Sequence, residues 1–285
     1  MELRPLYLPA FGAITTVVLL LLLRAGQRLL SPAHTVRSDM EEGHMAHALL
    51  QVGQVLGLFL ISGSVVAGCA QGESLWHDVL WVSAYGLAAL VLLVVFGHLG
   101  VRVLLRARLA AEVERGNIAA GLAAGAHYLA TGILLSRSVS GTNLSMLGVV
   151  LVFVVIAQIT LHLFVMLFRT LTAYDDAEEI LGENLAAAMS YAGITVALSL
   201  IIGHAVEGDF VGWAASLRGY ALALIFALAL YPVRQFFVQT LLLGARFTLR
   251  GGRLDQGIAA ERNLGMGVLE AVSYLAAAFL VTRLA

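Results

Sequence analysis

Residues 114–125, ERGNIAAGLAAG, decide the fold of this chain, because a charged pair gives way at Asn117 to a run of small apolar residues. The same pattern begins at three other places, where residues 42–53 are EGHMAHALLQVG, residues 182–193 are GENLAAAMSYAG and residues 261–272 are ERNLGMGVLEAV. Each copy follows an acidic segment and contains Asn, which is replaced by His in the first copy. Small residues follow two and four positions after this Asn or His. The sequence therefore predicts one structural unit that is used four times.

The composition places the chain in a membrane. It has 285 residues, of which 60% are hydrophobic and 12% charged, and its mean hydropathy is +0.91. Apolar windows of about 20 residues, long enough to cross a bilayer, occur near 8–30, 44–69, 78–105, 117–135, 144–168, 184–203, 214–243 and 263–282. A lipid-exposed backbone must satisfy its own hydrogen bonds, so each window should be a helix.

This pattern predicts an all-α integral membrane protein with eight transmembrane helices. Because each unit contains two crossings, all four units should point the same way, as four parallel helical-hairpin repeats. We place these hairpins at residues 1–72, 73–138, 139–208 and 209–285 of one membrane domain.

The predicted helices fall into two kinds. The first, third, fifth and seventh are bulky, whereas the other four are rich in Gly, Ala and Ser. Each small-residue helix carries a pair of small residues four positions apart, which are Gly53/Gly57, Gly121/Gly125, Gly193/Ala197 and Gly267/Ala271. Such pairs let helix backbones approach closely. We therefore expect these four helices to form an inner set, shielded from lipid by the bulky four.

Arginine placement predicts the orientation. Twelve arginines lie in or beside the loops that precede the small-residue helices, and only Arg4, Arg137, Arg218 and Arg283 lie on the other side. The positive-inside rule then puts the motif loops in the cytoplasm and both termini in the periplasm. A net charge of −1 argues against a nucleic-acid partner.

The repeated polar residues, His44, Asn117, Asn184 and Asn263, have two interpretations. Asn is a favoured N-cap, so helix capping and packing explain it without any ligand. The regular repetition also fits a direct role in a pathway across the membrane. The sequence alone does not separate these two roles.

Glu270 is the strongest single candidate for a functional side chain, because it lies seven residues after Asn263 inside an apolar helix. Intramembrane acids face a bundle interior, form pairs or become protonated. Arg234 follows Pro232, whose missing N–H favours a kink in the preceding helix, and this kink would let the guanidinium meet Glu270. A neutral packing role for Glu270 is the alternative.

Histidines provide weaker candidates. His98 and His162 lie within predicted spans and suit a proton relay, since imidazole titrates near neutral pH, although snorkelling or packing explains them as well. His44 and His47 lie about one helical turn apart, near Glu41 and Glu42, and form a weak candidate for a divalent-metal site. Without a phosphate-binding loop, a catalytic motif or a full ligand set in the sequence, we expect no metal, no cofactor and no enzymatic activity.

The motif carried by Asn117 and Asn184 resembles that of the family called domain of unknown function 350, which includes the YjfL-like bacterial inner-membrane proteins. Members typically carry two such hairpins, so the resemblance covers nearly the whole chain as four hairpins. It departs from the pattern at His44 and at Arg262. The resemblance implies a bacterial inner-membrane location and suggests an ion-channel-like element in membrane-stress systems.

Two functions follow as expectations. The first is an ion channel or small-solute transporter with His44, Asn117, Asn184, Asn263 and Glu270 lining its central region. The second is a non-transporting scaffold or sensor of membrane stress that recruits a cytoplasmic partner. A hydrated passage between the small-residue helices would favour the first, and a dry seam of Gly and Ala the second. The expected partners are the lipid bilayer, a second copy in a homodimer and a cytoplasmic membrane-stress protein.

Overall fold

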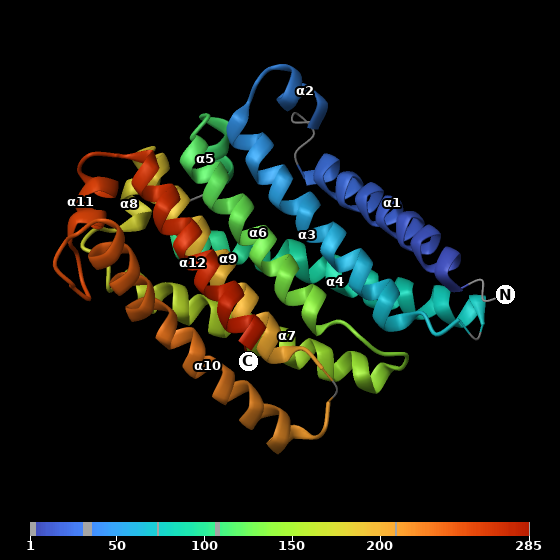
Figure 1. Cartoon of the computed structure of the whole chain (residues 1–285). Coiled ribbons are helices and arrows are strands. Elements are labelled where there is room, and N and C mark those ends of the chain that lie inside the picture. Colours follow the sequence, from blue (N-terminus) through green and yellow to red (C-terminus); the bar gives the residue numbers. More distant parts are fainter. Residues whose placement is uncertain (1–3, 31–35, 73, 106–108, 209, 285) are drawn as a thin grey trace.

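The computed structural model describes the chain except for residues 1–3, 31–35, 73, 106–108, 209 and 285 (Figure 1). The described residues are almost entirely helical and contain no strand. Within the described ranges, eight helices are long and apolar enough to cross a membrane. These are α1 (Arg4–Leu30), α3 (Met45–Cys69), α4 (Leu75–Leu105), α6 (Ile118–Ser138), α7 (Leu144–Arg169), α9 (Leu185–Val206), α10 (Trp213–Gln235) and α12 (Leu264–Leu284). The predicted all-α membrane fold is thus confirmed.

A short helix precedes each of the four small-residue helices, at the place of the acidic segment in the sequence. These short helices are α2 (Val36–Glu41), α5 (Leu109–Glu114), α8 (Asp176–Leu181) and α11 (Arg253–Ala259). In α8 the Asp175 side chain caps the helix by accepting a hydrogen bond from the N–H of Ala177, 2.9 Å away. A carboxylate there also complements the positive end of the helix dipole.

The four small-residue helices lie side by side in the order α3, α6, α9, α12, and these three pairings are the most extensive in the fold (Figure 1). The expected packing of these helices on one another is confirmed. Most of α6 and α9 is buried, whereas α3 and α12 are covered far less. The inner set is therefore an open row with two exposed ends, and its outer members are not shielded as the sequence analysis expected.

Glycines close the seams of this row. A Cβ on Gly53 or Gly125 would overlap the facing backbone between α3 and α6, and a Cβ on Gly193 would overlap Ala271 between α9 and α12. Backbones this close leave no room for water at those levels. The seams between α3 and α6 and between α9 and α12 are thus dry where these glycines lie.

The contacts of α3 with α6 recur between α9 and α12. Gly121 faces the carbonyl oxygen of Ala46, and Gly267 faces that of Ala186. Gly121 and Gly267 each lie four residues after the repeated Asn of their helix, while Ala46 and Ala186 each lie two residues after His44 or Asn184. The helix pair α3/α6 in the first half of the chain is thus equivalent to the pair α9/α12 in the second half.

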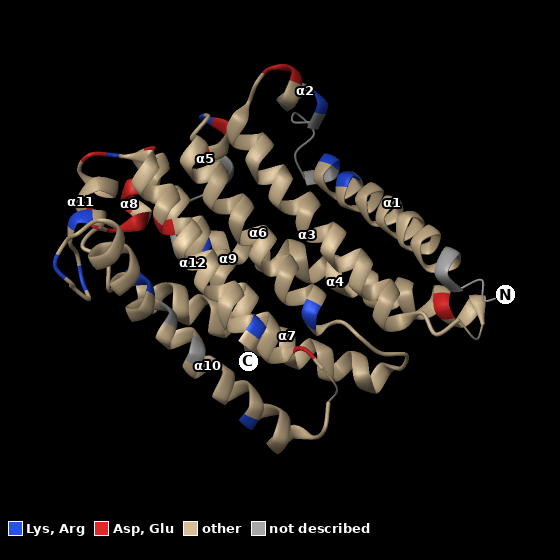
Figure 2. Ribbon diagram, viewed as in Figure 1, with Lys and Arg blue, Asp and Glu red and all other residues tan. Residues whose placement is uncertain are grey.

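Charged residues gather at the end of the bundle that carries α2, α5, α8 and α11 (Figure 2). Several form exposed ion pairs, such as Arg115 with Glu183 and Arg253 with Glu261. At the opposite end Arg137 pairs with Glu207 at 2.7 Å. Exposed pairs of this kind contribute little to stability, about 0–1 kcal/mol each.

The seventh membrane helix changes its geometry after Pro232. The α-helix α10 ends at Gln235 and continues as the π-helix η1 (Phe236–Leu242). Proline removes one backbone donor, so the hydrogen bonds around it must rearrange. Wider π-helical turns are frequently found at functional sites, and here the transition places Arg234 and Gln235 on the buried side of the helix.

Candidate functional site

The centre of the candidate site is an ion pair buried inside the membrane-spanning part of the second half. The Arg234 guanidinium contacts the Glu270 carboxylate, and each side chain is only 1% exposed. Arg234 comes from α10 and Glu270 from α12, as the kink at Pro232 led us to expect. Glu270 lies seven residues after Asn263, about 10 Å along a helix that rises 1.5 Å per residue.

Aromatic and amide side chains surround this pair. The guanidinium carbon of Arg234 lies 4.4 Å from the centre of the Tyr274 ring and 5.6 Å from that of Tyr231. Arg234 also donates a hydrogen bond to Gln235, whose amide nitrogen in turn donates to the Tyr231 hydroxyl. Only one carboxylate oxygen of Glu270 is engaged, and Oε2 has no hydrogen-bond partner among the described residues. The pair is thus held by the protein yet retains one free acceptor.

Two buried aspartates extend the charged cluster toward the end of the bundle with the short helices. Asp255 in α11 accepts a hydrogen bond from the N–H of Ala173, 2.6 Å away. Burial raises the pKa of the Asp255 carboxyl, and the Ala173 N–H and the charge of Arg234 oppose that rise. Asp176, at the start of α8, accepts a hydrogen bond from Arg169 at 3.1 Å. Burial raises the pKa of Asp176 to about 7, although the neighbouring Arg169 guanidinium pulls it down.

A cavity of about 600 Å³ opens beside Asp176. Its walls include Arg169, Thr170, Thr172, Asp175 and Arg250. This volume falls within the range of small-molecule sites, about 300–1,000 Å³. Of the buried acidic residues, Asp176 lines this cavity, whereas Asp255 and Glu270 do not.

The first half lacks this cluster. The position equivalent to Glu270 on α6 is Ala124, because each lies seven residues after the repeated Asn of its helix. The corresponding positions on α3 and α9 are Gln51 and Tyr191. Asp176 and Asp255 lie in the acidic segments before their helices, and nothing in their local sequence distinguishes a buried carboxylate from an exposed one.

Asn117 and Asn184 are buried and cap their helices. The side-chain oxygen of Asn117 accepts from the N–H of Ala120, and that of Asn184 accepts from the N–H groups of Ala186 and Ala187. Each amide nitrogen also donates to a carbonyl of the next unit, from Asn117 to Ile180 at 3.0 Å and from Asn184 to Ile258 at 2.8 Å. These two residues therefore have the capping and packing contacts that the structural interpretation requires.

Asn263 and His44 differ from those two. Asn263 is exposed and accepts a hydrogen bond from the N–H of Met266 at 3.3 Å. His44 is exposed, makes no side-chain cap bond, and its ring centre lies 6.3 Å from that of His47. No group of three or more His, Cys, Asp or Glu side chains among the described residues is arranged to hold a metal ion. The structure thus does not bring Asn117, Asn184, Asn263 and His44 together with Glu270 around one central passage.

The histidines within the membrane form a separate site. His162 faces His127 across α7 and α6, with ring centres 5.2 Å apart, and its Nδ1 lies 2.6 Å from the carbonyl oxygen of Gln158. His127 is fully buried, and neither of its ring nitrogens has a hydrogen-bond partner among the described residues. His98 is exposed on α4, and no described hydrogen bond or ring contact joins it to this pair.

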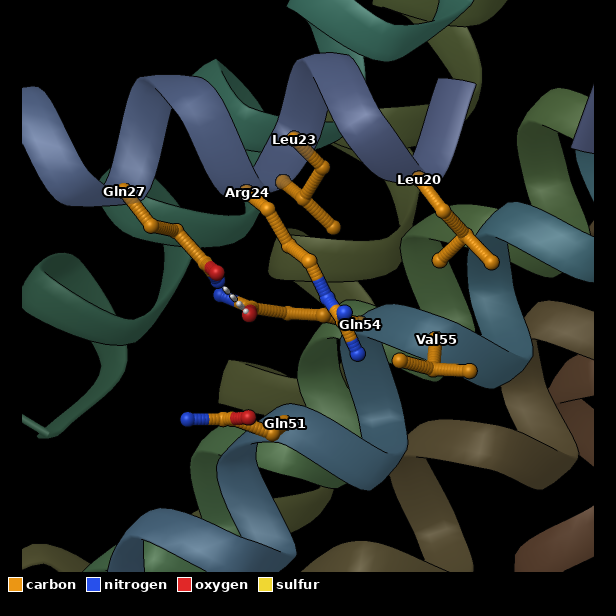
Figure 3. Close-up of a pocket in the computed structure, with 7 residues that line it drawn as sticks. All are labelled: Leu20, Leu23, Arg24, Gln27, Gln51, Gln54 and Val55. Atoms are coloured by element: carbon orange, nitrogen blue, oxygen red, sulfur yellow. Dashed lines mark hydrogen bonds between the residues drawn. The ribbon is translucent and has the colours of Figure 1, made fainter. Parts of the chain in front are cut away.

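A smaller polar site lies between α1 and α3 in the first half (Figure 3). The amide nitrogen of Gln27 donates to the side-chain oxygen of Gln54 at 2.6 Å, and Arg24 and Gln51 lie beside them. The enclosed volume is about 30 Å³. A space of this size is comparable to the volume of a single water molecule, so this site is far smaller than the cavity beside Asp176.

Comparisons with known proteins agree with this architecture. The family model described as Domain of Unknown Function (DUF350) matches residues 4–139 and, a second time, residues 142–284. A UPF0719 transmembrane protein of Aquifex aeolicus (strain VF5) is 25% identical over 239 residues, which are 83% of this chain and 84% of that protein. No solved structure matches this chain. The family domain thus occurs twice, and the two matches meet in the short connection between α6 and α7.

Proposed function

Because this chain belongs to the DUF350 family, whose name assigns no activity, we propose its function from the geometry of its buried charges. It is a bacterial inner-membrane protein that conducts protons or small cations through the polar cluster of its second half. The expected ion-channel or transporter role is kept, but the pathway is placed beside α9, α10 and α12 and not along a central axis. The proposal includes no enzymatic step.

The observation that carries the proposal is the buried ion pair of Arg234 and Glu270. Removing two charges from water costs several kcal/mol each, and a well-packed apolar pair is often as stable or more so. Ionisable side chains inside a membrane commonly mark ion pathways and proton relays. A charged pair retained in the second half, where the first half has Ala124 at the matching position, therefore points to a function of that half.

The neighbouring groups offer stepping points for a proton. Asp176 borders the cavity, and Asp255 and Asp176 interact electrostatically with each other. A carboxyl with a pKa of about 7 both takes up and releases protons at neutral pH. We place the entry at the cavity, followed by Asp176, Asp255 and Glu270.

Hydroxyl groups extend from this level toward the opposite side of the membrane. Tyr191, Thr195 and Ser199 are buried on α9 at intervals of four residues, which places them along one face of the helix. The face ends near the exposed Arg137–Glu207 pair. This stripe is the proposed exit route for protons, completed by water.

The arginine count sets the proposed direction. Under the positive-inside rule the end with the short helices faces the cytoplasm and both termini face the periplasm. The cavity beside Asp176 is then the cytoplasmic mouth. Protons would meet the buried carboxylates before the hydroxyl stripe when they leave the cell, and after it when they enter.

The dry glycine seams favour a second candidate function, the membrane-stress scaffold or sensor. A rigid row closed by Gly53, Gly125 and Gly193 suits a frame that presents its charged short helices to a cytoplasmic partner. In that case Arg234 and Glu270 would fix the packing of α10 on α12. Absence of ion flux with the parent protein would favour this function over conduction.

Purified protein in liposomes separates the two functions. We expect a pH-sensitive dye inside the vesicles to report proton flux with the parent protein, and at least tenfold less flux with Glu270→Gln or Asp176→Asn. The matched control is Glu41→Gln, which changes an exposed glutamate paired with Arg37 in the first half and should leave flux within twofold of the parent. Parallel gradients of Na⁺ and K⁺ identify the ion. Flat traces with all three ions from correctly folded parent protein would refute conduction.

A further inference from the structure

The two halves of the chain meet at an interface between α6 and α9 that has contacts at two levels. At the end with the short helices, Asn117 donates to the carbonyl of Ile180. Further along the same helices, Gly203 packs against Ile133, with a Cβ at Gly203 coming within 3.6 Å of the Ile133 side chain. Arg137, one turn after Ile133 on α6, lies against the same Gly203. These contacts define the register of the first half on the second.

The exposed ends of the row carry the same surfaces. The glycine contacts make α12 equivalent to α6 and α3 equivalent to α9. The position of Asn117 is thus taken by Asn263, and the position of Ile133 by Phe279, each sixteen residues further along its helix. On α3, Gly63 takes the position of Gly203, each nineteen residues after the residue that begins the motif.

Each of these equivalent residues lies at the exposed surface of the single chain. Ile133 is 7% exposed but Phe279 is 57% exposed. A Cβ on Gly63 would meet nothing within 4 Å. Met40 in α2 lies four residues before His44, as Ile180 lies four before Asn184, and Met40 is 47% exposed while Ile180 is fully buried.

The amide of Asn263 adds a polar group to this surface. Its nitrogen has no hydrogen-bond partner among the described residues, although the amides of Asn117 and Asn184 each donate to the carbonyl of a following short helix. An acceptor for the Asn263 amide nitrogen would be a carbonyl at the position that Ile180 holds relative to Asn117. Within this chain the equivalent carbonyl is that of Met40, at the opposite end of the row.

We propose that a second copy of this chain docks head to tail, with α12 of one protomer against α3 of the next. Asn263 then donates to the carbonyl of Met40, and Phe279 covers Gly63. Lipid covers apolar side chains equally well, so the proposal depends on these two contacts sharing one register with the α6/α9 interface. Because the contact joins two different surfaces, it closes into a ring or continues as a filament.

One contact of the α6/α9 interface is not reproduced. Arg115 donates to Glu183 at 2.5 Å, but the equivalent positions hold Glu261 and Gly43. Glu261 instead pairs with Arg253 of its own protomer. We therefore expect the contact between chains to be weaker than the contact between halves, so that detergent at high dilution separates the protomers.

Disulfide cross-linking in native membranes tests the register. In a Cys69→Ser background, Gly63→Cys and Phe279→Cys are made on separately tagged chains that are co-expressed. Oxidation should link the two tags, and reductant should separate them. Phe279→Cys alone should give no linked dimer, because a head-to-tail contact does not bring two α12 helices together. Efficient self-linking of Phe279→Cys, or no link between the two tags, would overturn the proposal.

Two further controls keep the outcome interpretable. Ile133→Cys with Gly203→Cys on one chain should form an intrachain link without an increase in mass, which shows that oxidation reaches this depth. In native mass spectrometry performed directly from membranes without detergent, Gly63→Trp should shift the assembled protein to monomers. Gly148→Trp, which also faces open space, should not. A parent protein that is monomeric in membranes, or a Gly63→Trp variant that stays assembled, would contradict the head-to-tail contact.

Discussion

The side-chain nitrogen of Asn117 lies 3.0 Å from the carbonyl oxygen of Ile180 and donates a hydrogen bond to it, which ties the start of α6 to the end of α8. The same side chain caps α6 through its oxygen. One amide thus satisfies a helix terminus and also links the two family domains. A single side chain with both roles explains why the motif pairs Asn with a preceding short helix.

We expect Asn117→Ala and Asn184→Ala to be more destabilising than a simple cap deletion. Loss of an N-cap costs about 0.5–2 kcal/mol, and loss of the second hydrogen bond adds about 1 kcal/mol. Asn143→Ala is the matched control, because Asn143 caps α7 through Met146 and is exposed. Thermal unfolding in detergent measures the difference, and equal shifts for all three variants would contradict the linking role.

The Arg234–Glu270 pair should show charge-reversal rescue. Either Arg234→Glu or Glu270→Arg alone places two like charges side by side in a buried site. This costs at least as much as an uncompensated buried charge, about 3–5 kcal/mol, so we expect loss of folded protein. The double reversal restores opposite charges and should recover folded protein in the membrane fraction. Size-exclusion chromatography after solubilisation measures recovery. A double variant as poorly folded as the singles would count against the pair.

Gly193 should not tolerate a methyl group. A Cβ there would overlap Ala271, so Gly193→Ala is expected to push α9 away from α12 and to lower stability by about 1–3 kcal/mol. The control is Gly148→Ala on α7, where a Cβ meets nothing within 4 Å. That change should be neutral or stabilising by up to about 1 kcal/mol, because Ala favours helix. The unfolding midpoint of Gly193→Ala should therefore fall, whereas that of Gly148→Ala should stay unchanged or rise.

The buried carboxyl of Asp176 predicts a pH dependence of stability. In the folded protein its pKa is raised to about 7, whereas an unfolded Asp titrates near 4, so between about pH 4 and 7 the folded chain binds more protons. The contribution of Asp176 to the free energy of unfolding therefore falls as pH rises through this window. Asp176→Asn should flatten the profile there, and exposed Glu261→Gln should not. An unchanged slope with Asp176→Asn would disprove the assignment.

The His127–His162 pair is expected to be structural and not part of the conduction route. The ring nitrogens of His127 lack partners, so His127→Leu removes unsatisfied polar atoms and should leave stability unchanged or raised by about 1 kcal/mol. Proton flux in liposomes should stay within twofold of the parent. A tenfold loss of flux with normal folding would instead place the histidines on the pathway.

The sequence predicted most of the fold because the bilayer imposes strong constraints. Spans near 44–69 and 144–168 differ by only a residue from α3 and α7, since hydrocarbon thickness sets their length. The pairs Gly53/Gly57 and Gly193/Ala197 correctly identified helices that pack closely. The four short helices were missed, because six or seven residues carry too little periodicity to be recognised.

The candidate site was predicted only in part. Pro232 beside Arg234 gave a local reason for a kink, and the contact with Glu270 followed from the hairpin. Asp176 and Asp255 could not be recognised, because their burial depends on how α8 and α11 pack in three dimensions. The hydrogen bond from Asn117 to Ile180 likewise joins residues far apart in the sequence. The spacing of apolar residues along the chain does not predict such long-range pairs.

Having both family domains in one polypeptide also affects how the protein can change over time. A protein assembled from identical single-domain subunits must accept every substitution twice, so a glutamate within the membrane would appear in both copies. Here the position of Glu270 in the second domain is taken by Ala124 in the first, so only one domain has a charged side chain at this depth in the membrane. The other copy is free to retain plain packing residues, so the two can specialise independently while descending from the same plan.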